Sequence, residues 1–232
     1  MASFSLFGGT NPATVASAEA VAVIGMGRFG QAIALELMAS GTEVLGIDSR
    51  EEIVQSLNAQ LTHVVRADAT SEETLRQLGL PEFGRVVVAI GSHIEASILV
   101  TSLLIRFGIE GIWAKAVSDA HGLILDQLGV EHVVYPEKDM GRRVAHLVHG
   151  SMQDYVEIEA DYALVKTRPP LSLVGRNLGE ADVRSKCGVT VIARRSEGGT
   201  WEDATPTTTL AAGDLVLVTG QSRKVEAFAQ MR

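Results

Sequence analysis

The fold of this chain can be inferred from residues 20–30, AVAVIGMGRFG, which join an apolar strand to a glycine-rich turn and a helix start. Ala20 to Ile24 is a short apolar run that ends at a glycine, as is typical of a buried parallel strand. Arg28 to Ala39 then places apolar residues at helical spacing. Glu43 to Ile47 predicts a second strand, which ends at Asp48. The stretch therefore predicts one strand–helix–strand unit.

The alternation of strands and helices continues outward from this unit. We expect further strands at 63–66, 85–90, 112–116 and 132–135, and helices at 49–58 (capped by Ser49), 71–78, 95–107, 120–128 and 136–149. Repeated strand–helix pairs predict an α/β fold with a doubly wound, Rossmann-like parallel sheet.

The pattern changes after Gly150. Residues 156–159 alternate in polarity, residues 162–166 are strand-like, and Pro169-Pro170 interrupts the chain. Further strands are expected at 189–193 and 215–218. We therefore predict a flexible leader at 1–18, a first domain at 19–150 with a crossover helix at 136–149, and a smaller α+β C-terminal domain at 151–232.

The composition of the chain argues against a nucleic-acid partner, a disulfide framework and a membrane-spanning segment. A net charge of -8 argues against a nucleic-acid partner, because nucleic-acid-binding proteins usually present a basic face. Cys187 is the only cysteine, which excludes a disulfide framework and favours a reducing cytoplasm. The longest apolar candidate, 94–105, is interrupted by Glu95 and falls short of the ~20 residues of a membrane span. We expect no direct membrane insertion.

The three glycines of the turn point to a dinucleotide or nucleotide site. Gly25 permits the tight turn, Gly27 lets a phosphate approach the backbone, and Gly30 allows close packing of helix on strand. The helix start adds backbone donors and a partial positive charge. Asp48 follows Gly30 by eighteen residues, at the end of the second strand, where a carboxylate would accept hydrogen bonds from ribose hydroxyls.

Two arginines refine the ligand class. Arg28 either makes bidentate contacts to phosphate oxygens or is a solvated arginine at a helix start. Asp48 should repel a ribose 2′-phosphate, which favours NAD or ATP-like ligands over NADP. Arg50 weakens that exclusion slightly.

Other candidates follow the later strands, at the sheet edge where such folds bind ligands. Asp68 is either a ligand contact or a cap of the following helix. Gly91 and Ser92 follow the fourth expected strand. Lys115 ends the fifth, and is either an interior lysine beside a phosphate or a surface lysine.

The residues already named resemble the regulator-of-potassium-conductance (RCK) proteins of the Ktr/Trk type over residues 20–232. Besides the glycine loop, the resemblance is carried by Ala89-Ile-Gly91, Trp113-Ala-Lys-Ala116 and above all Pro136-Glu-Lys-Asp-Met-Gly141. It implies a cytoplasmic regulatory subunit, peripheral at the inner face of the membrane, that gates a separate membrane potassium transporter. It also implies homodimers that assemble into an octameric ring, with ATP, ADP or NAD(H) favouring different ring shapes.

The resemblance also implies a set of nucleotide-binding residues: Gly25, Gly27, Arg28, Phe29, Gly30, Asp48, Ser49, Arg50, Asp68, Ala69, Ile90, Gly91, Ser92, Lys115, His121 and Glu137. Glu137 would lie near the γ-phosphate and hold a divalent cation. In the C-terminal domain, Asn177 and Arg184 are candidates for binding cyclic di-AMP. His93 departs from the family pattern, and so does the leader.

Three functions remain open from the residues. A ligand-sensing, non-enzymatic transporter subunit leads, because we recognise no set of catalytic residues beside the glycine loop. The alternatives are a small NAD-dependent oxidoreductase and a structural ring protein that nucleotide only stabilises.

Overall fold

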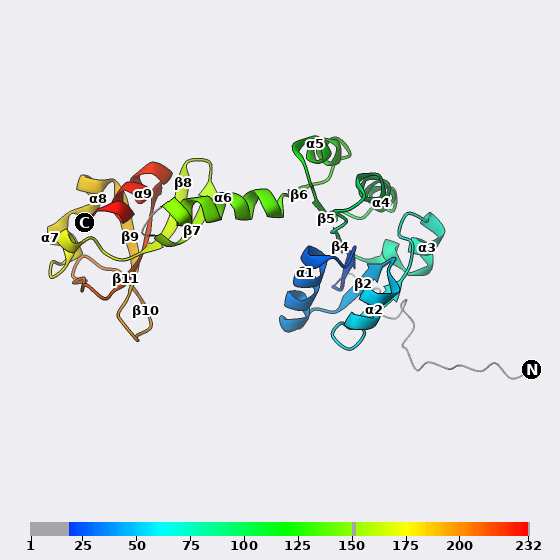
Figure 1. The fold of residues 1–232 in the computed structure, drawn as a ribbon, viewed down its shortest axis with the longest axis horizontal. Helices are drawn as coiled ribbons and strands as arrows, with labels where there is room; N and C mark the ends of the chain where they lie inside the picture. Colours follow the sequence, from blue (N-terminus) through cyan, green and yellow to red (C-terminus); the bar gives the residue numbers. More distant parts are fainter. Residues whose placement is uncertain (1–18, 150–151, 232) are drawn as a thin grey trace, which may run out of the picture. The chain divides into compact units, whose positions relative to one another are not determined.

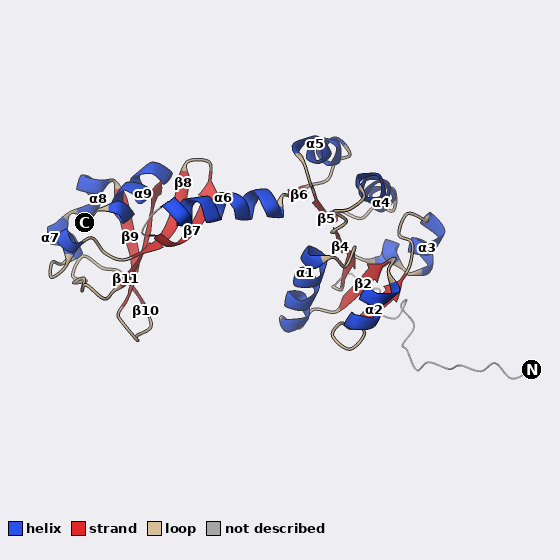
Figure 2. Ribbon diagram, in the orientation of Figure 1, coloured by secondary structure: helices blue, strands red, loops and turns tan. Residues whose placement is uncertain are grey.

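The computed structural model describes residues 19–149 and 152–231 and divides the chain into two compact units between Glu137 and Lys138. Figure 1 colours the chain along the sequence, and Figure 2 marks its helices and strands. The predicted leader at 1–18 lies outside the described residues.

In the described part of the first unit, six parallel strands form one sheet in the order β3-β2-β1-β4-β5-β6. The strands are β1 (Val21–Ile24), β2 (Val44–Asp48), β3 (His63–Arg66), β4 (Arg85–Val88), β5 (Gly111–Lys115) and β6 (His132–Val134). The connecting helices are α1 (Arg28–Ala39), α2 (Glu51–Leu57), α3 (Glu72–Gln77), α4 (Ile94–Arg106) and α5 (Asp119–Gln127). The predicted doubly wound parallel sheet is confirmed.

The sheet is apolar on both faces because helices cover both. Successive strand residues point to opposite faces. In β1, Val21 and Val23 pack in one core with Ala34 of α1, whereas Ala22 and Ile24 pack in the other, which includes residues of α4 and α5. This two-sided burial explains why the first strand reads as an uninterrupted apolar run.

The chain reverses direction across the sheet between β1 and β4, which are hydrogen-bonded neighbours. After β1 the chain proceeds to β2 on one side, and after β4 it proceeds to β5 on the other. The carboxyl ends of β1 and β4 therefore form the switch point at which open α/β sheets bind ligands.

The described residues of the second unit form a five-stranded antiparallel sheet in the order β10-β9-β11-β8-β7. Its strands are β7 (Met152–Glu159), β8 (Tyr162–Thr167), β9 (Val189–Arg195), β10 (Trp201–Asp203) and β11 (Leu215–Gln221), and its helices after α6 are α7 (Leu178–Ala181), α8 (Val183–Cys187) and α9 (Ser222–Gln230). Tyr155, Val165, Val218 and Phe228 are among its buried core residues. The smaller α+β unit is confirmed, although β10 and the helices after α6 were not predicted.

Helix α6 (Pro136–His149) begins at the end of the first unit and continues into the second. Arg143 binds Asp154 at 2.6 Å, and His146 binds Glu226 at 2.7 Å while its ring stacks on Tyr155. These contacts explain why residues 138–149 group with the second unit. The limits 19–150 and 151–232 stay a prediction.

Two local expectations are wrong. Ser49 does not cap α2, because Arg50 occupies the N-cap position, and the Arg50 side chain makes no capping hydrogen bond. Strand β4 ends at Val88 rather than Ile90, so Ile90 belongs to the loop that leaves the sheet edge.

Candidate functional site

The glycine loop 25–30 connects β1 to α1, and each glycine has a different geometric role. Gly25 has φ of 91°, a left-handed backbone that favours glycine. A Cβ atom added to Gly30 would overlap the Gly25 carbonyl oxygen, so close packing excludes a side chain there. At Gly27, by contrast, an added Cβ would meet no atom within 4 Å from described residues other than its immediate chain neighbours. Protein packing leaves the space beside Gly27 free for a ligand to approach the backbone.

The first turn of α1 faces this space without a side-chain cap. Gly27 is the N-cap residue and has no side chain, so the first amides of the helix lack the usual hydrogen bond to an N-cap side chain. Uncapped N–H groups together with the helix dipole attract anions. Arg28, the first residue of the helix, is exposed and adds a full positive charge.

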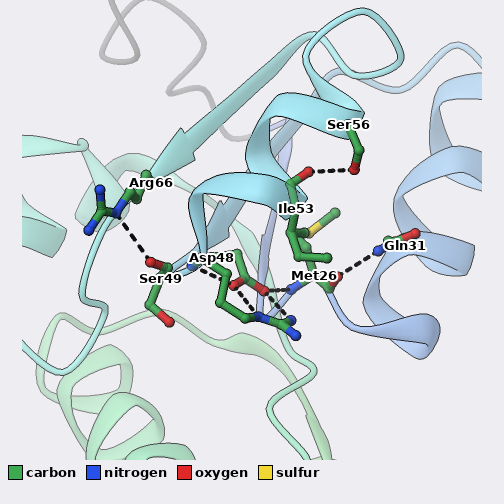
Figure 3. Close-up of polar contacts among 8 residues, drawn as sticks. Met26, Gln31, Asp48, Ser49, Ile53, Ser56 and Arg66 are labelled. Atoms are coloured by element: carbon green, nitrogen blue, oxygen red, sulfur yellow. Dashed lines mark hydrogen bonds and ion pairs between the residues drawn. The ribbon is translucent and has the colours of Figure 1, made fainter.

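Asp48 ends β2 and ties this strand to the glycine loop (Figure 3). Its Oδ2 accepts the Met26 N–H at 2.8 Å. Its Oδ1 accepts the Arg50 backbone N–H at 2.9 Å, and the Arg50 side chain donates to both oxygens, Nε to Oδ1 and Nη2 to Oδ2, each at 3.0 Å. The carboxylate is thus held in place where the sequence predicts a ribose contact.

The Asp48 carboxyl keeps its charge in this setting. Burial alone raises the pKa of Asp48, but the hydrogen bonds from Arg50 and Met26 outweigh it, so that the pKa lies below its usual value. A buried, ionised carboxylate is a strong acceptor for hydroxyl donors.

Asp68 follows β3 and closes a local turn. Its Oδ1 accepts both the N–H of Thr70 at 2.9 Å and the hydroxyl of Thr70 at 2.7 Å, and these bonds lower the pKa of Asp68. Ser71, not Asp68, caps α3, because its Oγ accepts the Thr74 N–H. The cap interpretation of Asp68 is wrong. The carboxylate is exposed, and Ala69 beside it is buried.

Lys115, at the end of β5, lies close to several of the other candidate residues. Its Nζ donates to Glu137 Oε1 at 2.6 Å and lies 5.6 Å from the centre of the Phe29 ring. A Cβ atom added to Gly91 would lie 3.4 Å from the same nitrogen. The Lys115 side chain is only 10% exposed, so the surface-lysine interpretation is wrong. This arrangement brings the start of α1, the loop after β4 and the end of β5 together with the start of α6.

Glu137 is the exposed partner of Lys115. The hydrogen bond from Lys115 is the main cause that lowers the pKa of Glu137, and the charge of Arg28 contributes as well. Within the ranges 19–149 and 152–231, no group of three or more His, Cys, Asp or Glu side chains could hold a metal ion. One carboxylate already bound to a lysine is not a metal centre, so a divalent cation at Glu137 would need phosphate oxygens as further ligands. The metal assignment stays a prediction.

His121, in the first turn of α5, is buried. Its Nδ1 accepts the Val117 N–H at 3.4 Å, which leaves its Nε2 without a hydrogen-bond partner among the described residues. Burial lowers the pKa of His121, so the imidazole is neutral at pH 7. An unpaired buried nitrogen is consistent with a ligand contact, which stays a prediction.

The remaining candidates divide between the two units. Ser49, Ile90 and Ser92 lie in the loops that follow β2 and β4. In the second unit, Asn177 caps α7 by accepting the Glu180 N–H at 2.8 Å, and Arg184 is exposed on α8. The capping bond explains Asn177 without a ligand, and cyclic di-AMP binding stays a prediction.

Two features were not predicted from the sequence. The backbone amide of Met26 donates to Asp48, and the apolar Met26 side chain gives no signal of this contact. Tyr162 and Lys166 have the Tyr-x-x-x-Lys spacing of some dehydrogenases. Both lie on β8, where four residues span ~13 Å instead of the ~6 Å of a helix. They do not form a catalytic pair.

Two domain families match successive parts of this chain. Residues 21–136 match the TrkA-N domain, and residues 163–231 match the TrkA-C domain. The Ktr system potassium uptake protein C of Bacillus subtilis (strain 168) is 36% identical over 89% of this chain and 94% of its own length. This chain belongs to the Ktr family of potassium uptake proteins. Within that family, the Ktr system potassium uptake protein A of Vibrio alginolyticus is 32% identical over 88% of this chain and 93% of its own length.

Solved structures support the fold of this Ktr-family chain. The GsuK channel superposes with a TM-score of 0.65 at 15% identity, over 92% of this chain and 40% of that one. The TrkA-N domain of the inner membrane protein ybaL from Escherichia coli gives a TM-score of 0.51 at 23% identity, over 56% and 97%. None of the helices in the described ranges is long and apolar enough to cross a membrane.

Proposed function

We propose that this chain is the regulatory subunit of a potassium uptake system, and that an adenine nucleotide bound at the switch point of its first unit controls a separate membrane transporter. Membership of the Ktr family supports the potassium system. The observation that carries the nucleotide is the uncapped start of α1, open beside Gly27, next to the buried carboxylate of Asp48.

The ligand would lie with its ribose at Asp48 and its phosphates along the start of α1. Ser49 to Arg50 would border the ribose, Asp68 and Ala69 the base, and Ile90 to Ser92 the edge of the sheet. ATP, ADP and NAD(H) all carry an adenosine ribose and phosphates. The GsuK channel, which shares only the fold, has been solved with NAD bound.

The γ-phosphate supplies the means of regulation. Lys115 and Arg28 present positive charge near Glu137, where a third phosphate would reach them and ADP would not. A ligand shifts a conformational equilibrium only by binding one state better than another. ATP would therefore favour the arrangement of subunits that forms the γ-phosphate contacts, in a homodimer that assembles into an octameric ring.

Calorimetry and ion flux test this proposal together. Titration of the full chain with ATP, ADP and NADH should give binding that Arg28→Ala weakens more for ATP than for ADP. Arg106→Ala is a matched control, because Arg106 is an exposed arginine on α4 that binds Glu72. Co-purification with the membrane subunit and measurement of potassium flux should then show control by nucleotide that the Arg28 variant loses.

Three outcomes would redirect the proposal. Equal ATP affinity and flux in Arg28→Ala would refute the γ-phosphate switch. Absorbance-detected hydride transfer with any substrate would favour an oxidoreductase. Ligand binding that stabilises the oligomer in ultracentrifugation without changing flux would favour a structural ring protein.

A further inference from the structure

The carboxylate of Asp48 has no free acceptor position in this structure. A carboxylate offers about four lone-pair sites. The Met26 N–H, the Arg50 N–H, and the Nε and Nη2 of Arg50 each donate one bond to Asp48, at 2.8 to 3.0 Å. A ribose hydroxyl therefore cannot simply add a bond to this group; one of the present donors has to leave.

The four bonds are of two kinds. The amides of Met26 and Arg50 belong to the backbone of the glycine loop and the start of α2, and they are fixed by the fold. The other two bonds come from the Arg50 guanidinium, whose side chain is 52% exposed while that of Asp48 is 5% exposed. An exposed arginine can leave its partner and be hydrated, so these two bonds are the exchangeable ones.

The exchangeable bonds match a ribose in number and direction. The Arg50 side chain uses Nε and Nη2, one to each carboxylate oxygen, in the forked geometry of a guanidinium. A 2′,3′-diol also presents two neighbouring O–H donors. The two hydroxyls of the diol can therefore replace the two guanidinium hydrogen bonds to Asp48, one for one. The two backbone hydrogen bonds to Asp48 then remain in place.

We propose that Arg50 sets the affinity and the sugar specificity of the ribose subsite, because its guanidinium occupies the two acceptor positions that a ribose diol requires. The inference rests on the proposed nucleotide site and deepens it. The resemblance implies that Arg50 is one of the nucleotide-binding residues, whereas on this proposal its side chain competes with the ribose for Asp48. Ribonucleotides bind against this competition, and nucleotides without the diol leave the Asp48–Arg50 pair intact.

The test compares ATP with 2′,3′-dideoxy-ATP by calorimetry on the full chain. Arg50→Met removes the fork but keeps an apolar stem and the backbone N–H to Asp48. We expect the ratio of ATP affinity to dideoxy-ATP affinity to rise about three- to tenfold in Arg50→Met, the range of an exposed but bidentate ion pair. Arg50→Lys, which cannot form the fork, should give an intermediate ratio.

The ratio separates competition from a general effect of charge. Arg66→Met is the matched control, because Arg66 is an exposed arginine on β3, beside Asp48 in the sheet register, whose side chain donates to the Ser49 carbonyl oxygen at 3.3 Å and pairs with Glu51 rather than with the Asp48 carboxylate (Figure 3). Loss of a positive charge near the phosphates weakens both ligands by the same factor in either variant. Only the loss of competition at Asp48 changes the ratio, so Arg66→Met should keep the wild-type value.

Each other result overturns the inference in a recognisable way. An unchanged ratio in Arg50→Met, with both ligands still binding, shows that Arg50 does not compete with the diol. A lower ratio shows that Arg50 binds the ribose directly. Absence of binding by either ligand to the folded wild-type chain, with folding checked by circular dichroism, refutes the nucleotide site itself and the inference with it.

Discussion

Two ion pairs lie at the carboxyl ends of strands in the first unit, and they bury opposite charges. At the end of β2 the anion is buried and the cation exposed, with side-chain exposures of 5% for Asp48 and 52% for Arg50. At the end of β5 the cation is buried and the anion exposed, with 10% for Lys115 and 68% for Glu137. A buried charge needs a partner, and an exposed partner can be exchanged at small cost. Each pair thus holds a fixed charge that suits one part of a nucleotide: an acceptor for ribose and a cation for phosphate.

The largest effect should follow from the buried anion. Asp48→Asn keeps the size of the side chain but removes the charge and replaces one acceptor with a donor that faces Met26 or Arg50. We expect ATP affinity to fall about 100-fold (~2.7 kcal/mol) and stability to fall by ~1–3 kcal/mol. Calorimetry and urea unfolding measure the two. Equal ATP affinity in wild type and Asp48→Asn would remove Asp48 from the ribose site.

The buried cation should matter less to folding and be selective for phosphate. Lys115→Met keeps an apolar stem and leaves Glu137 in solvent, so we expect stability to change by under ~1 kcal/mol. ATP affinity should fall about tenfold to thirtyfold, while adenosine affinity should not change. A parallel loss of adenosine binding would mean that the substitution has distorted the whole site.

The exposed anion should give a smaller effect whose sign depends on metal. In EDTA, Glu137→Gln frees Lys115 from its partner and should tighten ATP binding about threefold. With Mg²⁺ present, wild type should gain affinity and the variant should not, since it lacks the carboxylate. A gain of the same size in both would exclude Glu137 as a cation ligand.

Acid titration should give the smallest effect and separate the two anions. The folded-state pKa of Asp48 lies below its usual value of 3.8, so its stabilisation is present above pH 3.8 and is lost as pH falls through the folded pKa. Asp48→Asn lacks this contribution, so its melting temperature should fall less than that of the wild type as the pH drops below 4. The difference between the two falls should be a few °C. The pKa of Glu137 is lowered as well, but the exposed carboxylate contributes little to stability. Equal acid sensitivity in wild type and Asp48→Asn would contradict this difference.

Much of the first unit could be predicted because its signals are local. Apolar runs that end at glycine gave the parallel strands, and the limits of α1 at Arg28 and Ala39 agree with the predicted helix. Second-unit elements were harder. Strand β10 is short and exposed, and helices α7 and α8 are too short for a periodic apolar pattern. Strand and helix ends also shifted, because hydrogen bonding and capping geometry determine them.

The sequence by itself determined the doubly wound sheet, the place of the glycine loop and the family, because apolar period, glycine spacing and the PEKDMG stretch are properties of contiguous residues. Only the tertiary structure decided the pairing of charges. Lys115 and Glu137 are 22 residues apart, and Met26 reaches Asp48 through a backbone amide that carries no side-chain signal. Burial also determines which member of each pair is held in place. Solvent screens the exposed charges of Arg50 and Glu137 and can hydrate them, whereas the buried charges of Asp48 and Lys115 stay where the fold holds them.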